Sequence, residues 1–182
     1  MMLRTITALV FAAAMLATGG AYAQQATTPA APAPYPLDNI PDKMPWANAY
    51  GAPITLQRAQ AAINAAVAEA NKRGWPLVIT VMDSGANLVA VVRMDGAQLA
   101  SLAISEHKAR AAVKFRRPTK VFEEGVQKSG FNYLLSLDDI VGSRGGIPLI
   151  DDNKIIGAIG CSGGTGSQDE VVCMAGAATI NK

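Results

Sequence analysis

The pattern of hydrophobic and polar positions divides most of the chain into alternating helical and β-type segments. Apolar residues recur every three or four positions over 56–72, which is the spacing of one helix face. Thr55 is placed to cap this helix and Gly74 to end it. Two β-rich runs follow at 77–83 and 88–94, and the four residues between them, Ser-Gly-Ala-Asn, predict a hairpin.

The second half of the chain is predicted to contain two helices, a second hairpin and a last helix. Helices are predicted over about 98–115 and about 118–128, and the mixed pattern of 131–146 favours short helical pieces. The runs 147–150 and 154–161 flank Asp-Asp-Asn and predict a second hairpin.

A glycine-rich loop at 162–166 leads into a last helix that reaches about Ile180. Ser167 and Glu170 have the spacing of a capping box at its start. Because hairpin strands are antiparallel neighbours, two hairpins interleaved with helices predict an α+β fold. We therefore expect one antiparallel sheet covered by helices.

The first hydrophobic concentration, at residues 1–23, has the parts of a secretory signal peptide. Arg4 lies in a short leading region, an apolar run covers 6–17, and an A-x-A cleavage site ends at Ala23. The apolar run is shorter than the roughly 20 residues that a membrane-spanning helix needs. The sequence thus predicts cleavage after Ala23 and a periplasmic or secreted protein that does not span the membrane.

Residues 24–45 form a Pro/Ala-rich segment, which we interpret as a linker because dense prolines favour extended backbone. The folded domain is then predicted at 46–182, long enough to bury a core.

Composition narrows the function. The 182 residues are 50% hydrophobic, and 16 Lys and Arg stand against 14 Asp and Glu, a net charge of +2. This composition excludes a disordered polyionic tail, and its near-neutral balance argues against a nucleic-acid binder.

The segment 107–120 nevertheless holds six Lys or Arg and no acid. At helical spacing His107, Arg110 and Lys114 share one stripe. An imidazole beside two cations could coordinate a haem iron and pair with its propionates. The alternative is a solvated helix face whose cations complement the helix dipole.

A second set of polar residues lies at two turns. Arg93 and Asp95 lie where the predicted strand 88–94 ends in a turn, and Gly163 and Gly164 belong to the loop 163–169, where free backbone N–H groups precede a helix. Together they could form a pocket for a small carboxylated metabolite. The alternative is that they are ordinary turn residues.

The two cysteines, Cys161 and Cys173, either form a disulfide, which an exported protein permits, or are small buried residues. Neither a zinc-binding set nor a C-x-x-C-H haem attachment site is present. With one histidine and no G-x-S-x-G motif, hydrolase chemistry is not expected.

Several short motifs, in order, resemble the GlcG/HbpS-like haem-binding (haem-degrading domain) family over nearly all of 53–180. They are Pro53–Leu56, Val81–Ala90, Arg93–Ala97, Lys108–Arg110, Gly145–Pro148, Gly157–Gly160, Ser162–Gly164 and Gln168–Asp169. The resemblance implies a profilin-like antiparallel sheet, homo-oligomers and, in some members, haem binding, iron handling or partnership with a sensor kinase.

The leading hypothesis is an exported haem-binding protein, acting in haem or iron handling, sensing or breakdown. His107 would bind iron, with Arg110, Lys114 or Arg116 near the propionates, and Met82 or Met94 as softer alternative ligands. Two alternatives stay open: an enzyme or enzyme accessory for a small carboxylated metabolite, and an oligomeric module that regulates a membrane sensor. Whether the protein turns over a substrate is left open.

Overall fold

The computed structural model describes residue 37 and residues 40–181. The predicted leader and most of the predicted linker lie outside these described residues. The domain contains, in order, β1 (Ala49–Tyr50), α1 (Leu56–Arg73), β2 (Val78–Asp83), β3 (Leu88–Arg93), α2 (Ser101–Lys114), α3 (Lys120–Gln127), the short 3₁₀ helix η2 (Asn132–Ser136), β4 (Gly146–Asp151), β5 (Lys154–Ser162) and α4 (Gly166–Ala177).

The strands form one five-stranded sheet with β5 at its centre. β5 pairs antiparallel with β2 along one side and with β4 along the other, and β3 pairs antiparallel with β2. The predicted α+β architecture and both hairpins are confirmed. The strand β1 was not predicted. It pairs parallel with the first residues of β5 over only two positions, and both of its residues are exposed.

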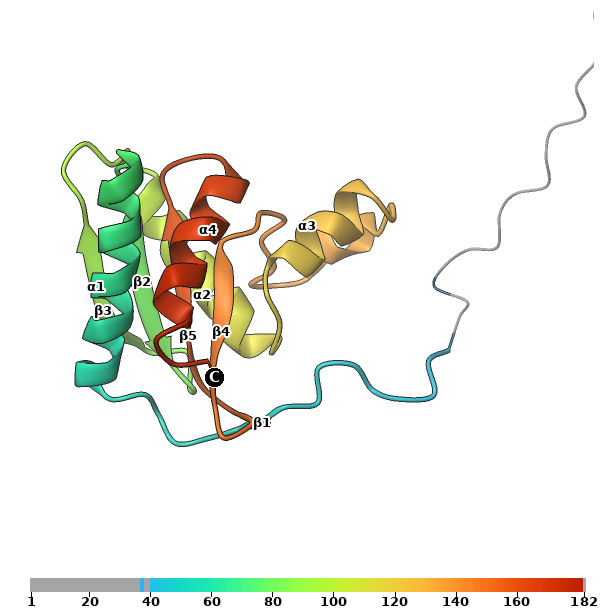
Figure 1. Cartoon of the computed structure of the whole chain (residues 1–182). Helices are drawn as coiled ribbons and strands as arrows, with labels where there is room; N and C mark the ends of the chain where they lie inside the picture. The colour runs from blue at the N-terminus through green and yellow to red at the C-terminus, as the bar shows by residue number, and fades with distance from the viewer. Residues whose placement is uncertain (1–36, 38–39, 182) are drawn as a thin grey trace, which may run out of the picture. The chain divides into compact units, whose positions relative to one another are not determined.

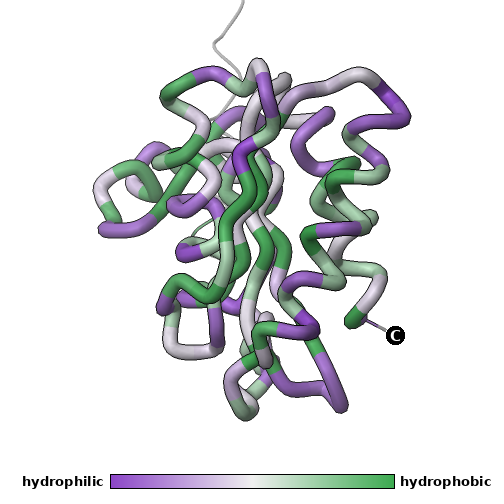
Figure 2. The backbone as a smooth tube through the Cα atoms, turned by 90° about the vertical axis from the view of Figure 1, so that its left-hand side faces the viewer, coloured by the Kyte–Doolittle hydropathy of each residue, from purple (hydrophilic) through white to green (hydrophobic). Residues whose placement is uncertain are grey.

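Helices cover both faces of the sheet, with α1 and α4 on one face and α2 on the other (Figure 1). Side chains alternate along β5 because successive residues of a strand point to opposite faces. Ile159 and Cys161 join the core beneath α1 and α4, whereas Ala158 packs against Ala112 and Val113 of α2. Figure 2 shows the resulting hydrophobic stretches along the central strands.

The ends of α1 are those predicted. The Thr55 side chain accepts a hydrogen bond from the backbone N–H of Arg58, and Gly74 adopts the left-handed conformation, with φ of 68°, that favours glycine.

The predicted start of the last helix is wrong. The capping box is formed by Thr165 and Gln168, two residues before Ser167 and Glu170. Both pairs have the required spacing, but the strand β5 ends at Ser162 and the helix begins sooner than the sequence indicated.

Two facing glycines let α2 lie close to the sheet. Gly146 of β4 and Gly160 of β5 are direct partners in the ladder. A Cβ atom on Gly160 would lie 2.1 Å from the carbonyl oxygen of Ser105, and one on Gly146 would lie 2.2 Å from that of Lys108. The backbone of α2 occupies the space that any larger residue would need.

The outer edge of β4 is closed by hydrogen bonds from outside the sheet. The Thr119 hydroxyl accepts from the backbone N–H of Gly146, and the N–H of Thr119 donates to the Gly146 carbonyl. The Asn181 side chain donates to the Pro148 carbonyl and accepts from the N–H of Ile150. Pro148 itself has no N–H, which suits an edge strand.

Candidate functional site

The outward stripe of α2 carries the predicted haem residues. The buried side of this helix, which includes Lys108 and Ala112, faces the sheet, so the helical repeat turns His107, Arg110 and Lys114 away from it. His107 and Arg110 are half-buried and Lys114 is exposed. The structure therefore brings these three side chains together on one surface, as the spacing indicates.

An aspartate from a later loop faces this stripe. The Lys114 ammonium donates to the carboxylate of Asp139, a residue held in the left-handed conformation at φ of 65°. This hydrogen bond lowers the pKa of Asp139 below its usual value, and the charges of Arg110 and His107 add to the effect. The basic stripe is thus partly neutralised by a group that is distant in sequence.

Other cations of the segment 107–120 also have partners. Lys108 and Lys120 pair with Asp169 and Glu170, so with Lys114 three of the six cations face carboxylates from elsewhere in the chain. Arg116 lies over the ring of Tyr50 and donates to the carbonyl of Asn48, away from the stripe. The surplus of charge visible in the sequence is therefore smaller in the folded protein.

Beneath the stripe lies a buried ion pair. The Nζ of Lys108 is 2.7 Å from Oδ2 of Asp169, and the two side chains are 1% and 3% exposed. Asp169 also accepts from the backbone N–H of Gly164 at 3.0 Å. Burial raises the pKa of Asp169, while the Lys108 ammonium and the backbone donors oppose that rise. The pair fastens α2 to the first turn of α4.

The sequence pointed to Asp169 only as part of a motif of the family resemblance and did not indicate this ion pair. The available signal was that Lys108–Arg110 and Gln168–Asp169 both belong to the motifs of the family resemblance. Gly145, from a third motif, completes the arrangement, because a Cβ there would lie 2.8 Å from Cβ of Asp169.

The residues predicted to form a metabolite pocket do not line one hollow together. Arg93 and Asp95 are exposed at the end of β3, and the hollow of about 260 Å³ beside them is lined by Asp95 but not by Arg93. Gly163 packs closely on the backbone of Pro76, and the N–H of Gly164 is bound to Asp169. The backbone of the glycine loop is thus bound to the first turn of α4 and is not free to bind a ligand anion.

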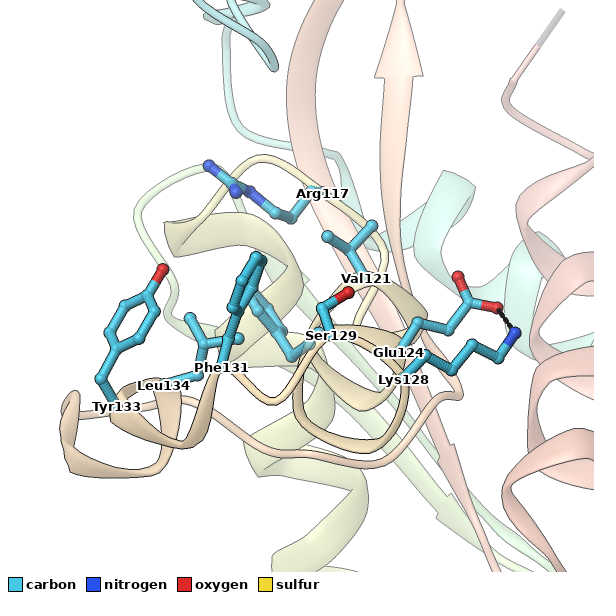
Figure 3. A pocket seen from close by; sticks show the side chains of 10 residues that line it. Arg117, Val121, Glu124, Lys128, Ser129, Phe131, Tyr133 and Leu134 are labelled. Carbon is cyan, nitrogen blue, oxygen red and sulfur yellow. Dashed lines mark hydrogen bonds and ion pairs between the residues drawn. The ribbon is translucent and has the colours of Figure 1, made fainter. Parts of the chain in front are cut away.

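A larger hollow, of about 400 Å³, lies between α3 and η2 (Figure 3). Its walls include Phe131, Leu134 and Val121, with Arg117 and Tyr133 at one end. This hollow was not predicted, because the segment 131–146 lacks a regular hydrophobic period.

Cys161 and Cys173 form a disulfide with a Cα–Cα distance of 5.7 Å, which joins β5 to α4. Met82 is fully buried in the sheet, which removes it from contact with any ligand at the surface. Among residues 37 and 40–181, no three His, Cys, Asp or Glu side chains gather in a way that could hold a metal ion. No helix in the same residues has the length and apolar character needed to cross a membrane.

Comparison with known proteins gives consistent matches. The chain is 40% identical to Protein GlcG of Escherichia coli K12 over 109 residues, 60% of this chain and 81% of GlcG. A crystal structure of HbpS superposes with a TM-score of 0.67 at 28% identity, covering 77% of this chain and 99% of that one. A crystal structure of a PduOC:heme complex superposes with a TM-score of 0.64 at 26% identity, covering 71% and 96%.

The family model for the haem degrading protein HbpS-like matches residues 54–178, which include every helix of the domain and four of its five strands. The chain therefore belongs to the HbpS-like family.

Proposed function

We propose that this protein binds haem on the outward stripe of α2, with His107 as the iron ligand. The observation that carries the proposal is the position of this single histidine, half-buried in the middle of α2 and on the same outward stripe as Arg110 and Lys114. The similarity to a PduOC:heme complex supports the ligand class.

The residues present fit such a group. His107 offers an imidazole, which is a common axial ligand of haem iron, and Arg110 and Lys114 are placed to pair with propionates. Ile104, one helical turn before His107, is 36% exposed and offers apolar surface to the macrocycle. Bound haem would supply redox-active iron, and the chain would supply the ligand, the counter-charges and one wall.

Asp139 sets the electrostatics of this surface. Its carboxylate holds Lys114 and would repel a propionate that approaches the same ammonium. We infer that haem binding requires Lys114 to exchange Asp139 for a propionate. Removal of this carboxylate charge should therefore favour haem, whereas removal of the cations should oppose it.

Titration of the purified protein with hemin should produce a shifted Soret band, and His107→Ala should weaken the affinity at least about tenfold because the chain has no second imidazole. Lys114→Gln should weaken binding about two- to fivefold, within the range of exposed charge pairs. Asp139→Asn should strengthen it by a similar factor. Absorbance titrations at fixed ionic strength measure all three.

A matched control is Arg73→Gln, which removes an exposed cation on α1 at the other face of the sheet. Hemin dimethyl ester, which lacks the propionate charges, should bind without dependence on Lys114 or Asp139. An unaltered titration in His107→Ala would remove this residue as ligand, and the absence of any Soret shift in the parent protein would remove the haem proposal.

We also propose that the protein is exported and cleaved after Ala23. The A-x-A site and the Cys161–Cys173 disulfide, which an oxidising compartment allows, support this proposal. The intact mass of protein recovered from the periplasm should correspond to residues 24–182 with both cysteines oxidised. A mass that retains residues 1–23, or two free thiols by alkylation, would contradict it. The homo-oligomer and the sensor-kinase partner stay predictions of the family resemblance.

A further inference from the structure

The hollow between α3 and η2 has two chemically different ends (Figure 3). Arg117 and the hydroxyl of Tyr133 lie at one end. Phe131, Leu134 and Val121 form the walls between the ends. A ligand in this space would therefore meet apolar surface along its length and donors at its tip.

Arg117 is a half-buried cation held in a fixed orientation. Its guanidinium lies 5.6 Å from the ring centroid of Trp46 and 5.9 Å from that of Phe122, and its Nε donates to the Phe115 carbonyl at 2.9 Å. Burial lowers the pKa of Arg117, and the charge of neighbouring Arg116 lowers it further.

No carboxylate pairs with Arg117 among residues 40–181, and its two terminal nitrogens donate no hydrogen bond there. Arg144, by contrast, is bound by both Glu123 and Glu170. A half-buried guanidinium without a counter-ion loses part of its hydration free energy. An anion that bound to it would compensate for this loss through charge-assisted hydrogen bonds.

The opposite end of the hollow does not repel an anion. Glu124 lines it but is bound to Lys128 at 2.9 Å and lies 3.9 Å from Arg144. Its negative charge is thus matched within the rim. The positive charge of Arg117 has no such partner. A ligand of this hollow should therefore be negatively charged, with its charged group at the Arg117 end.

The volume limits the size of the ligand. About 400 Å³ lies at the small end of ligand pockets, which span roughly 300–1,000 Å³. Aromatic walls favour a planar ring through stacked or edge contacts. A molecule with one or two rings fits these limits better than a macrocycle does.

We propose that this hollow is a second ligand site, which binds a small aromatic carboxylate with its ring between Phe131 and Leu134 and its carboxylate on Arg117. The Tyr133 hydroxyl donates a further hydrogen bond to the carboxylate. The site is separate from the haem stripe of α2 and does not depend on it.

Isothermal titration with 2-naphthoate tests this proposal, and 2-naphthamide serves as its neutral isostere. The carboxylate should bind at least about tenfold more tightly than the amide, because only the carboxylate forms a charge-assisted pair with the guanidinium. Arg117→Gln should abolish that preference. Ser129→Trp, a substitution at an exposed lining residue, should fill the hollow and remove binding of both compounds.

Arg93→Gln is the matched control, since it removes an exposed arginine at the end of β3 and should leave the naphthoate affinity unchanged. The hemin titration of Arg117→Gln should also match that of the parent, which would show an intact fold and a separate site. Absence of naphthoate binding, equal binding of the amide, or loss of binding in Arg93→Gln or His107→Ala instead would each overturn the proposal.

Discussion

Lys108→Met should lower the free energy of unfolding by about 3–5 kcal/mol, because it leaves the buried carboxylate of Asp169 without its partner. Methionine keeps the length and apolar stem of lysine, so little packing is lost. Urea denaturation of the purified variant at pH 7, compared with the parent, measures the change.

The pH dependence identifies the cause of this loss. Without Lys108, the pKa of the buried Asp169 carboxyl rises further, so the folded state takes up a proton more readily than the unfolded state. The deficit of Lys108→Met should therefore shrink as the pH falls from about 7 to about 5. A deficit that is constant with pH would point to lost packing instead.

Asp169→Asn supplies the matched partner for a double-mutant cycle. Its amide oxygen can still accept from the N–H of Gly164, while the negative charge is gone. In the Lys108→Met background it should restore stability, whereas alone it should destabilise the fold by leaving the ammonium unpaired. Additive effects of the two substitutions would contradict the coupling.

Gly160→Ala should be a comparably severe substitution, with a loss of about 3 kcal/mol or more in the free energy of unfolding. The added Cβ would lie 2.1 Å from the Ser105 carbonyl oxygen and 2.6 Å from the Ala109 nitrogen, both backbone atoms of α2. The helix would have to move by about 1.4 Å to restore a normal contact distance of roughly 3.5 Å to the Ser105 oxygen. Thermal and urea unfolding followed by circular dichroism measure the loss.

Movement of α2 would also strain two polar contacts beneath it, the 2.8 Å hydrogen bond between Thr80 and Ser105 and the Lys108–Asp169 pair. Gly142→Ala is the control, since a Cβ there meets only the Leu135 side chain at 3.5 Å, and we expect a change within about 0.5 kcal/mol. Equal effects of the two glycine substitutions would contradict close packing as the cause.

The sequence predicts the elements of this fold well where local chemistry decides them. Thr55 and Gly74 bound α1 as expected, and both hairpins appear at their predicted positions. It fails at the start of α4, where Thr165–Gln168 and Ser167–Glu170 offer competing caps. Which of the two caps forms depends on the residue at which β5 ends, and that residue is determined by strand pairing in the assembled sheet.

The candidate sites show a similar division. Helical spacing correctly brings His107, Arg110 and Lys114 onto one stripe, because that relation is local. Asp139 and Asp169, which pair with Lys114 and Lys108, lie 25 and 61 residues further along the chain. The sequence of the helix alone therefore predicts a more positive surface than the folded protein has. The hollow around Arg117 depends on the approach of α3 and η2 and has no signature in the sequence.

The closed edge of β4 limits how copies of this chain can associate. Proteins that stack strand on strand need two open sheet edges per copy to propagate a fibre. Among the described strands, Thr119 and Asn181 occupy the edge at β4, and the terminal strand β1 is only two residues long. This leaves β3, at the other end of the sheet, as the edge long enough to accept a neighbouring strand. Association through the sheet would therefore stop at a closed pair, which protects a protein with an apolar central sheet from runaway polymerisation.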